Sequence, residues 1–359
     1  MSITQQNPFA NAISSICQPF FAREIEASAI LTCILAGYNP ALIGSPGTAK
    51  SALARRVLEA LPSPHFTCLL HAFSDPDDTL GALSLTELKK DRRVRNTSGY
   101  LPSVQFAFID EIFKARSAML TAILSLLNER IYMEEGKAQP ALLKAVIGAS
   151  NEFPDEESGA LADRFVMFIP VNNCEDRKSF LEFALNGGTN AEPLVKKDSE
   201  GRELRLFTTR FLRETSSKID EVLRLNADRI ADTLMQFDSI VEHKASRFAN
   251  ARLSDRALLQ CARLLATSCV MRQSEEVVLE DAWSFGFLAR SYDYQSIYQD
   301  ACRELLKPTE CLDALKERLR RGTRADFTIV ENSMSKLPLH WQIDLQRLLS
   351  KILEQSTKK

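Results

Sequence analysis

The pattern of hydrophobic and polar positions changes character about halfway along the chain. In the first half, short continuous apolar runs alternate with segments whose apolar residues recur every three or four positions. The runs are typical of strands buried on both faces, and the longer period is typical of amphipathic helices. Strands alternating with helices predict a parallel sheet in an α/β domain. The expected strands are 41–43, 106–109, 145–149 and 166–170, and the expected helices are 25–38, 51–61 and 117–129.

The second half has a helical pattern and no convincing strand run. It follows the polar, glycine-bearing stretch NGGTNAEPLVKKDSEGR at 186–202, which reads as a loop or linker. We therefore expect four regions, namely an α/β domain over 1–188, a linker over 189–203, an all-helical domain over 204–300 and a helical C-terminal segment over 301–359.

An apolar stripe marks the last predicted helix. Trp341, Leu345, Leu348 and Ile352 fall at helical spacing and share one face. The stripe predicts either packing against this chain's own helical domain or docking of a partner or neighbouring subunit.

Composition narrows the class of protein only a little. The 359 residues carry a formal net charge of −2, so nothing global favours nucleic acid or an anionic membrane. The eight cysteines contain no C-x-x-C pair, which argues against structural zinc and fits buried thiols in a reducing compartment. Since no apolar stretch is long enough to span a bilayer and the N-terminus has no signal-peptide pattern, we expect a cytoplasmic protein.

The stretch GSPGTAKS follows the first predicted strand and opens a helix. It matches the phosphate-loop pattern G-x-x-x-x-G-K-[ST] except that Ala49 replaces the second glycine. A helix N-terminus offers unpaired N–H groups and a positive dipole end, which suit phosphate. Lys50 is the candidate for the β- and γ-phosphates of ATP, and Ser51 the candidate for Mg²⁺. The candidate nucleotide-binding residues are Gly44, Ser45, Pro46, Gly47, Thr48, Ala49, Lys50 and Ser51.

Polar residues follow the next two predicted strands. Asp110 comes directly after the run FAFI and could complete the Mg²⁺ shell, while Glu111 could activate a water molecule. A strand end that meets solvent would also explain both acids. Asn151 follows the strand at 145–149 and could orient the attacking water, or it could cap a loop.

Two arginines complete the set of candidates. Arg164 precedes the fourth strand and could reach the γ-phosphate of a neighbouring subunit, or pair with Asp163 on the surface. Arg256 lies near the start of a helix in the second domain and could touch phosphates from there, or have no special role. Each residue is ambiguous alone, but their order and spacing together indicate an ATP-hydrolysing site.

This ordered set resembles the AAA+ ATPases, in particular the MoxR branch and its regulatory ATPase variant A (RavA) group. The likeness covers roughly residues 10–300 and rests on several segments. These are GSPGTAKS, TSGYLPSVQFAFIDEIFKA, LLNERIY, GASNEFP, ALADRF, LSDR and YDYQS.

The resemblance implies a three-layer α/β nucleotide domain with a helical lid, assembled as a hexameric ring that hydrolyses ATP between subunits. It also implies a role in remodelling or chaperoning proteins, with partners that carry von Willebrand factor A (vWA) domains. Residues 77–100 take the place of an insert that this clade carries in its second helix. After residue 300 the chain departs from the RavA pattern, which continues there in a long arm.

Alanine is the usual residue of this branch where Ala49 stands. We expect Ala49 to lie at the helix start with a negative φ, where alanine suits as well as glycine. Gly44 or Gly47 is then the position that needs permissive geometry.

Two other functions stay open. The run KKDRRVR at 89–95 could make the chain a nucleotide-dependent, DNA-associated AAA+ module, although a solvated loop explains it too. A small-molecule P-loop kinase is a third possibility, but it would need neither the Arg164 nor the Arg256 role.

Overall fold

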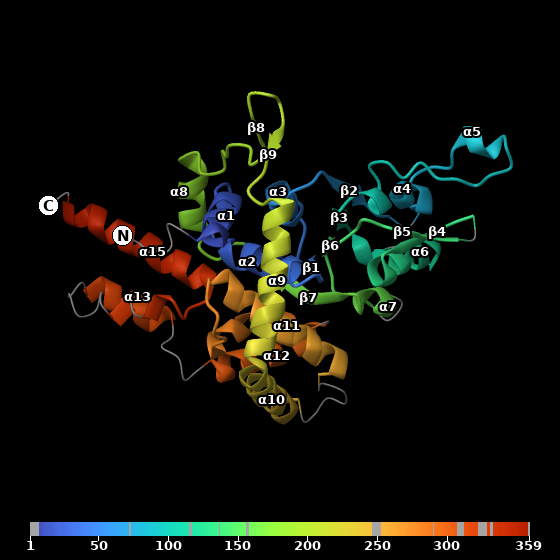
Figure 1. Ribbon diagram of the computed structural model, residues 1–359. Helices are drawn as coiled ribbons and strands as arrows, with labels where there is room; N and C mark the ends of the chain where they lie inside the picture. The colour runs from blue at the N-terminus through green and yellow to red at the C-terminus, as the bar shows by residue number, and fades with distance from the viewer. Residues whose placement is uncertain are drawn as a thin grey trace. The chain divides into compact units, whose positions relative to one another are not determined.

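The computed structural model describes most of the chain as two compact units, shown together in Figure 1. One unit, here the α/β unit, comprises Gln18–Phe21 and Ala29–Leu212. The other, the helical unit, comprises Met1–Cys17, Ala22–Ser28 and Arg213–Lys359. The described residues are 7–71, 73–114, 117–135, 137–155, 158–245, 253–289, 291–306, 312–321, 329–330 and 333–357.

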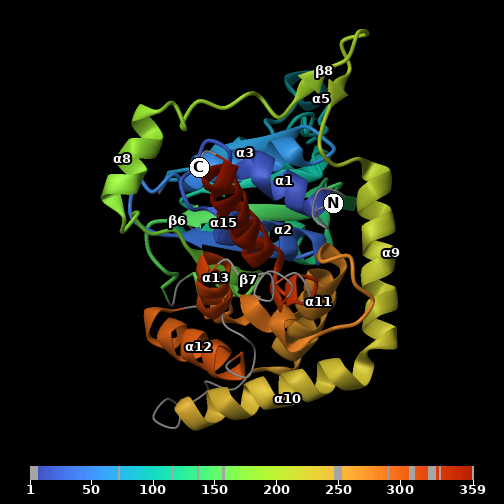
Figure 2. The ribbon, with the colours of Figure 1, turned by 90° about the vertical axis from the view of Figure 1, so that its left-hand side faces the viewer.

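A five-stranded parallel sheet forms the centre of the α/β unit (Figure 2). Its spatial order is β2-β3-β6-β1-β7, so β1, the first strand in sequence, lies between β6 and β7. The strands are β1 (Asn39–Ile43), β2 (His65–Leu69), β3 (Phe106–Asp110), β6 (Ala145–Ser150) and β7 (Phe165–Pro170). The predicted α/β class and its parallel sheet are confirmed, and β2 is an additional strand at one edge.

Helices cover both faces of this sheet. Ile43 and Ile109 point to one face and pack with Ile123 of α6 (Ser117–Glu129) in a single apolar cluster. Leu42 and Phe108, one position away along the same strands, point to the other face and are also buried. On that face α3 (Lys50–Ala60) contacts β3 and β6. The result is the predicted three-layer arrangement.

Several short elements of the α/β unit were not predicted from sequence. Most of them are hairpins or one-turn helices, which contain too few residues to establish a hydrophobic period. The longest, a nine-residue helix, has no buried residue. They are α4 (Pro76–Leu80), α5 (Leu85–Leu88), the 3₁₀ turns η2 (Leu101–Ser103) and η3 (Ile112–Lys114), the hairpin β4–β5 (Ile131–Glu134 and Lys137–Pro140), α7 (Gly159–Ala162), α8 (Arg177–Leu185) and the hairpin β8–β9 (Lys196–Lys197 and Glu203–Leu204).

The predicted linker is folded against α3. Within it, β8 and β9 pair as a hairpin. Arg205, just after it, donates hydrogen bonds of 3.4 Å to the carbonyls of Glu59 and Leu61 at the end of α3. Phe207 N–H donates to the Ala60 carbonyl at 2.9 Å. The α/β unit therefore extends to Leu212, beyond the boundary at 188 that the sequence pattern suggested.

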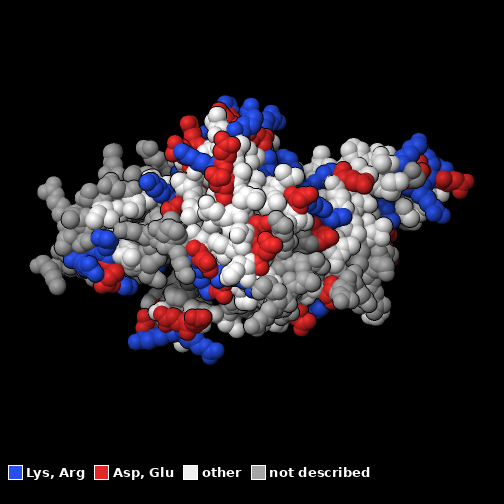
Figure 3. All heavy atoms as spheres, turned by 90° about the horizontal axis from the view of Figure 1, so that it is seen from below, with Lys and Arg blue, Asp and Glu red and all other residues white. Residues whose placement is uncertain are grey.

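The basic run at 89–95 lies in the insert and is partly neutralised there. The Arg95 guanidinium pairs with the Asp77 carboxylate and donates to the Gly81 carbonyl at 2.7 Å. Lys90 and Arg92 both pair with Glu87. Figure 3 shows blue and red atoms mixed at its right-hand end, where the insert lies in Figure 1. This segment is therefore a mixed-charge surface with three of its basic side chains already paired.

The helical unit contains the long helices of the second half together with the N-terminal helix. The prediction placed residues 1–17 in the first domain, but α1 packs against the C-terminal helix α15 instead. Two helices, α2 (Glu24–Leu35) and α9 (Thr209–Leu225), cross between the units. The other helices that the structure describes in this unit are α1 (Pro8–Cys17), α10 (Ala227–Lys244), α11 (Asp255–Met271), η4 (Leu279–Phe287), α12 (Tyr292–Leu305), α13 (Leu312–Arg321) and α15 (Leu339–Thr357).

The apolar stripe of α15 is packed inside the helical unit. Leu345 is fully buried with Leu315 and Leu319 of α13, and the other stripe residues, Trp341, Leu348 and Ile352, pack against the same cluster. Of the two interpretations of this stripe, the contacts favour internal packing. Among the helices that the structure describes, none has both the length and the apolar composition needed to cross a bilayer.

Candidate functional site

The loop between β1 and α3 is shaped by two glycines with different requirements. Gly47 has a φ of +84°, which L-amino acids with a side chain rarely adopt. At Gly44 the constraint is space, because a Cβ atom would lie 2.3 Å from the Val171 carbonyl oxygen. The expectation that Gly44 or Gly47 needs glycine is met at both positions, for different physical reasons.

The expected negative φ of Ala49 is wrong. Ala49 is the N-cap residue of α3 and lies in the left-handed region, with φ +69° and ψ +20°. The loop reverses direction immediately before the helix, so the last loop residue must adopt a conformation that suits glycine better than alanine. Ala49 thus adopts a left-handed backbone conformation that favours glycine, although it has a methyl side chain.

Lys50 points into the loop that precedes it. Its Nζ donates to the Gly44 carbonyl, to the Ser45 carbonyl at 3.0 Å and to Asn151 Oδ1 at 3.1 Å. Burial lowers the pKa of Lys50, while the nearby Asp110 and Glu111 carboxylates oppose that shift. A cation is therefore held where the loop's N–H groups and the helix N-terminus converge.

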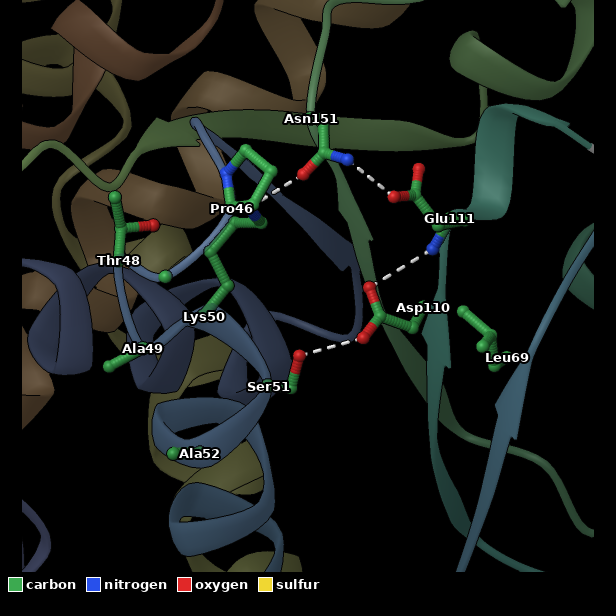
Figure 4. Close-up of a pocket in the computed structure, with 11 residues that line it drawn as sticks. Pro46, Thr48, Ala49, Lys50, Ser51, Ala52, Leu69, Asp110, Glu111 and Asn151 are labelled. Carbon is green, nitrogen blue, oxygen red and sulfur yellow. Dashed lines mark hydrogen bonds between the residues drawn. The ribbon is translucent and has the colours of Figure 1, made fainter.

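Ser51 and Asp110 place two side-chain oxygen atoms next to each other. Ser51 Oγ donates to Asp110 Oδ2 at 2.7 Å (Figure 4). Mg²⁺ prefers oxygen ligands and is usually held by one or two protein groups together with phosphates and water. A hydroxyl and a carboxylate side by side at the mouth of the loop fit such an ion.

Glu111 and Asn151 lie on adjacent strand ends and contact each other. Asn151 Nδ2 donates to Glu111 Oε1 at 2.6 Å, while its Oδ1 accepts from Lys50 (Figure 4). Glu111 has a φ of +53°, a strained conformation for a residue with a side chain. Its N–H donates to Asp110 Oδ1 at 3.1 Å. One polar chain therefore joins the loop lysine, the amide and the second acid.

These side chains line a pocket of about 330 Å³ at the carboxyl ends of β1, β3 and β6. In open parallel sheets, ligands bind at this edge, where side chains of neighbouring strands converge. Sequence reasoning missed Leu69, because β2 was not predicted, and Ala52 in the first turn of α3. The lining residues are Pro46, Gly47, Thr48, Ala49, Lys50, Ser51, Ala52, Leu69, Asp110, Glu111 and Asn151.

Arg164 lies near the amino ends of the strands, whereas the pocket lies at their carboxyl ends. It immediately precedes β7, whose first residue, Phe165, pairs with Asn39 at the start of β1. The pocket lies beyond the other end of β1, past Ile43. Five residues of strand span roughly 16 Å, so Arg164 is remote from the pocket of its own chain.

Arg256 belongs to the helical unit and does not line the pocket. It lies in the first turn of α11, behind the N-cap Ser254, and its side chain is exposed. The predicted position near a helix start is confirmed, whereas its role stays a prediction.

The comparisons with known proteins agree with this geometry. Residues 7–211 match the family model described as the MoxR domain in the MoxR-vWA-beta-propeller ternary systems. Two uncharacterized proteins of Methanocaldococcus jannaschii are 33% and 35% identical over 267 and 235 residues, which are 73% and 65% of this chain. The chain spans only 64% and 59% of the length of these relatives.

A solved structure shows the same fold. The crystal structure of a "putative ATPase" from Cytophaga hutchinsonii superposes with a TM-score of 0.62 at 15% sequence identity, over 85% of this chain and 94% of that one. The finer likeness to the RavA group stays a prediction, since the matching model describes the MoxR domain of the ternary systems. Because that model matches more than half of the chain, over the loop, both acids and Asn151, the protein belongs to the MoxR family of AAA+ ATPases.

Proposed function

We propose that this chain binds ATP with Mg²⁺ in the pocket at residues 44–51 and hydrolyses it. The observation that carries the proposal is the polar chain from Lys50 through Asn151 to Glu111, beside the Ser51–Asp110 pair. Few structural roles would require a buried cation, an amide and a strained acid to converge on one pocket.

Each side chain has a distinct part in the proposed reaction. Lys50 would hold the β- and γ-phosphates, and Ser51 and Asp110 would hold Mg²⁺, which would supply charge neutralisation at the phosphates. Asn151 orients a water molecule, and Glu111 accepts a proton from that water as the water oxygen attacks the γ-phosphorus. The bond from this phosphorus to the β–γ bridging oxygen breaks, and ADP leaves with that oxygen.

Arg164 is proposed to act in the pocket of a neighbouring copy. Its place at the amino edge of the sheet makes a role in its own pocket difficult and supports contact across a subunit interface. In a ring of six copies, as the resemblance to AAA+ ATPases implies, each subunit would supply its Arg164 to the pocket of a neighbour. Arg256 is proposed to contact phosphates from the helical unit.

The proposed partner is a protein that carries a vWA domain. The support is the family description, which places such MoxR domains in systems with a vWA and a β-propeller component. We propose that hydrolysis drives remodelling of that partner or of a protein it presents. The alternative of a DNA-associated module is less well supported, because three basic side chains of the insert are already paired.

Two variants test the proposed reaction. Lys50→Ala should lose binding of a fluorescent ATP analogue, whereas Glu111→Gln should keep binding and lose phosphate release. Glu111→Gln with ATP should then retain a vWA protein during co-purification. If Glu111→Gln hydrolyses ATP at the wild-type rate, the assignment of the base is wrong. Filter binding of DNA over a salt range tests the alternative.

A further inference from the structure

Lys114 makes a direct contact with the proposed base, and no step of the reaction above uses it. It ends the 3₁₀ turn η3, which starts immediately after Glu111. Lys114 N–H donates to the Glu111 carbonyl at 2.9 Å, and Lys114 Nζ lies 3.2 Å from Glu111 Oε2. Residues three apart eclipse each other in a 3₁₀ turn, so the backbone bond places the ammonium group over the carboxylate.

The two oxygens of Glu111 meet different groups, a hydrogen-bond donor at Oε1 and a charged group at Oε2. Asn151 donates to Oε1, and Lys114 pairs with Oε2. The two partners approach from different elements, the end of β6 and the end of η3. The hydrogen bond at Oε1 and the ion pair at Oε2 together restrain rotation of the carboxylate about its terminal bond.

The exposure of the two side chains argues against a mainly stabilising role for this ion pair. The Lys114 side chain is 58% exposed, whereas that of Glu111 is 16% exposed. An ion pair with one partner in water contributes little to folding. The ion pair instead acts locally on Glu111, whose strained backbone already directs its side chain into the pocket.

We propose that Lys114 is a positioning residue for Glu111, an inference that rests on the proposed ATP hydrolysis. Its ammonium group holds the carboxylate in the orientation that accepts the proton from the attacking water. Small displacements of a reacting group cost much of the rate that orientation provides. Lys114 does not line the pocket, so its loss should affect turnover and leave nucleotide binding intact.

Three variants of the full chain test this inference. Lys114→Met keeps the length of the side chain and removes its charge, and Lys114→Arg keeps the charge. Lys196→Met is the matched control, because it breaks another lysine–carboxylate pair, with Glu192 at 3.6 Å, on the exposed β8–β9 hairpin. Steady-state phosphate release and equilibrium binding of an ATP analogue are measured for each.

The expected result is a split between kcat and KM. Lys114→Met should lower kcat roughly tenfold and leave KM and analogue affinity within about twofold. Lys114→Arg should recover most of kcat, and Lys196→Met should match the wild type. If the wild type hydrolyses ATP and Lys114→Met has the same kcat, the role of Lys114 is wrong, while the proposed ATP hydrolysis stands. If the wild-type chain, assembled and supplied with Mg²⁺, does not hydrolyse ATP, the proposed function fails and this role fails with it.

Discussion

Asn39 Nδ2 donates a hydrogen bond of 2.9 Å to the backbone carbonyl of Arg164. Asn39 Oδ1 also accepts from Val146 N–H at 2.9 Å, so one side chain joins the starts of β1, β6 and the segment before β7. This contact fixes the backbone of Arg164 at the amino edge of the sheet. The arginine is thus held at a defined place that is remote from its own pocket.

The first prediction follows from that placement. Arg164→Ala should bind nucleotide like the wild type and hydrolyse ATP poorly. Mixing it with Lys50→Ala protein should restore part of the activity, because some interfaces would then combine an intact pocket with an intact arginine. Phosphate release is measured across mixing ratios. Mixtures that co-assemble by size-exclusion chromatography and recover no activity would argue for a role within one chain.

The second prediction concerns the left-handed alanine. Ala49→Gly should raise the free energy of unfolding by about 1 kcal/mol. Alanine in this conformation costs roughly 1–2 kcal/mol, which glycine avoids. Glycine offsets part of that gain because it has more conformational freedom in the unfolded chain. Chemical denaturation measures the change. Gly44→Ala is the contrasting variant, since its Cβ would meet the Val171 carbonyl and should destabilise the loop. If Ala49→Gly and the wild type are equally stable, the left-handed conformation of Ala49 does not destabilise the folded chain.

The third prediction concerns acid stability. His340 is buried against the Trp283 ring, with 4.4 Å between ring centroids, and burial lowers its pKa to about 3. The unfolded chain binds a proton at His340 below about pH 6.5, while the folded chain does not until about pH 3. Stability therefore falls as pH drops through this window, by up to ~1.4 kcal/mol per pH unit from this residue.

Denaturation of His340→Leu between pH 7 and pH 4.5 checks that slope. The variant should lose less stability on acidification than the wild type does. His243→Leu is the control, because that histidine lies exposed on α10. A slope in His340→Leu as steep as in the wild type would show that other groups govern the acid response.

The fourth prediction concerns the C-terminal helix. Leu345→Ala should cost about 2–5 kcal/mol, because Leu345 is fully buried against α13 and its loss leaves a cavity. Leu259→Ala should change stability by less than ~0.5 kcal/mol, since Leu259 is 73% exposed on α11. Thermal unfolding of both variants makes the comparison. A fully stable Leu345→Ala chain that loses a partner in pull-downs would restore the docking interpretation.

Much of this protein could be predicted from its sequence, for a physical reason. The strands β1, β3, β6 and β7 are buried on both faces, which requires unbroken apolar runs, and their ends must carry the polar groups that meet the pocket. The residues Lys50, Asp110, Glu111 and Asn151 were therefore identifiable from their order and spacing along the chain, although each was ambiguous alone. The strand β2 has no buried residue, and β8 and β9 have two exposed residues each, so these strands lack an apolar run that would mark them.

Only the tertiary structure decided how these residues meet. The approach of Asn151 to Glu111 depends on β6 lying beside β3, a pairing across more than thirty residues of sequence that no local pattern encodes. The left-handed conformation of Ala49, with φ +69°, was not evident from the sequence, which favoured a negative φ for alanine at a helix start. Sequence determined which side chains were available, whereas sheet order determined which of them share a pocket. Arg164 lies at the amino ends of the strands because it precedes β7, which runs parallel to β1.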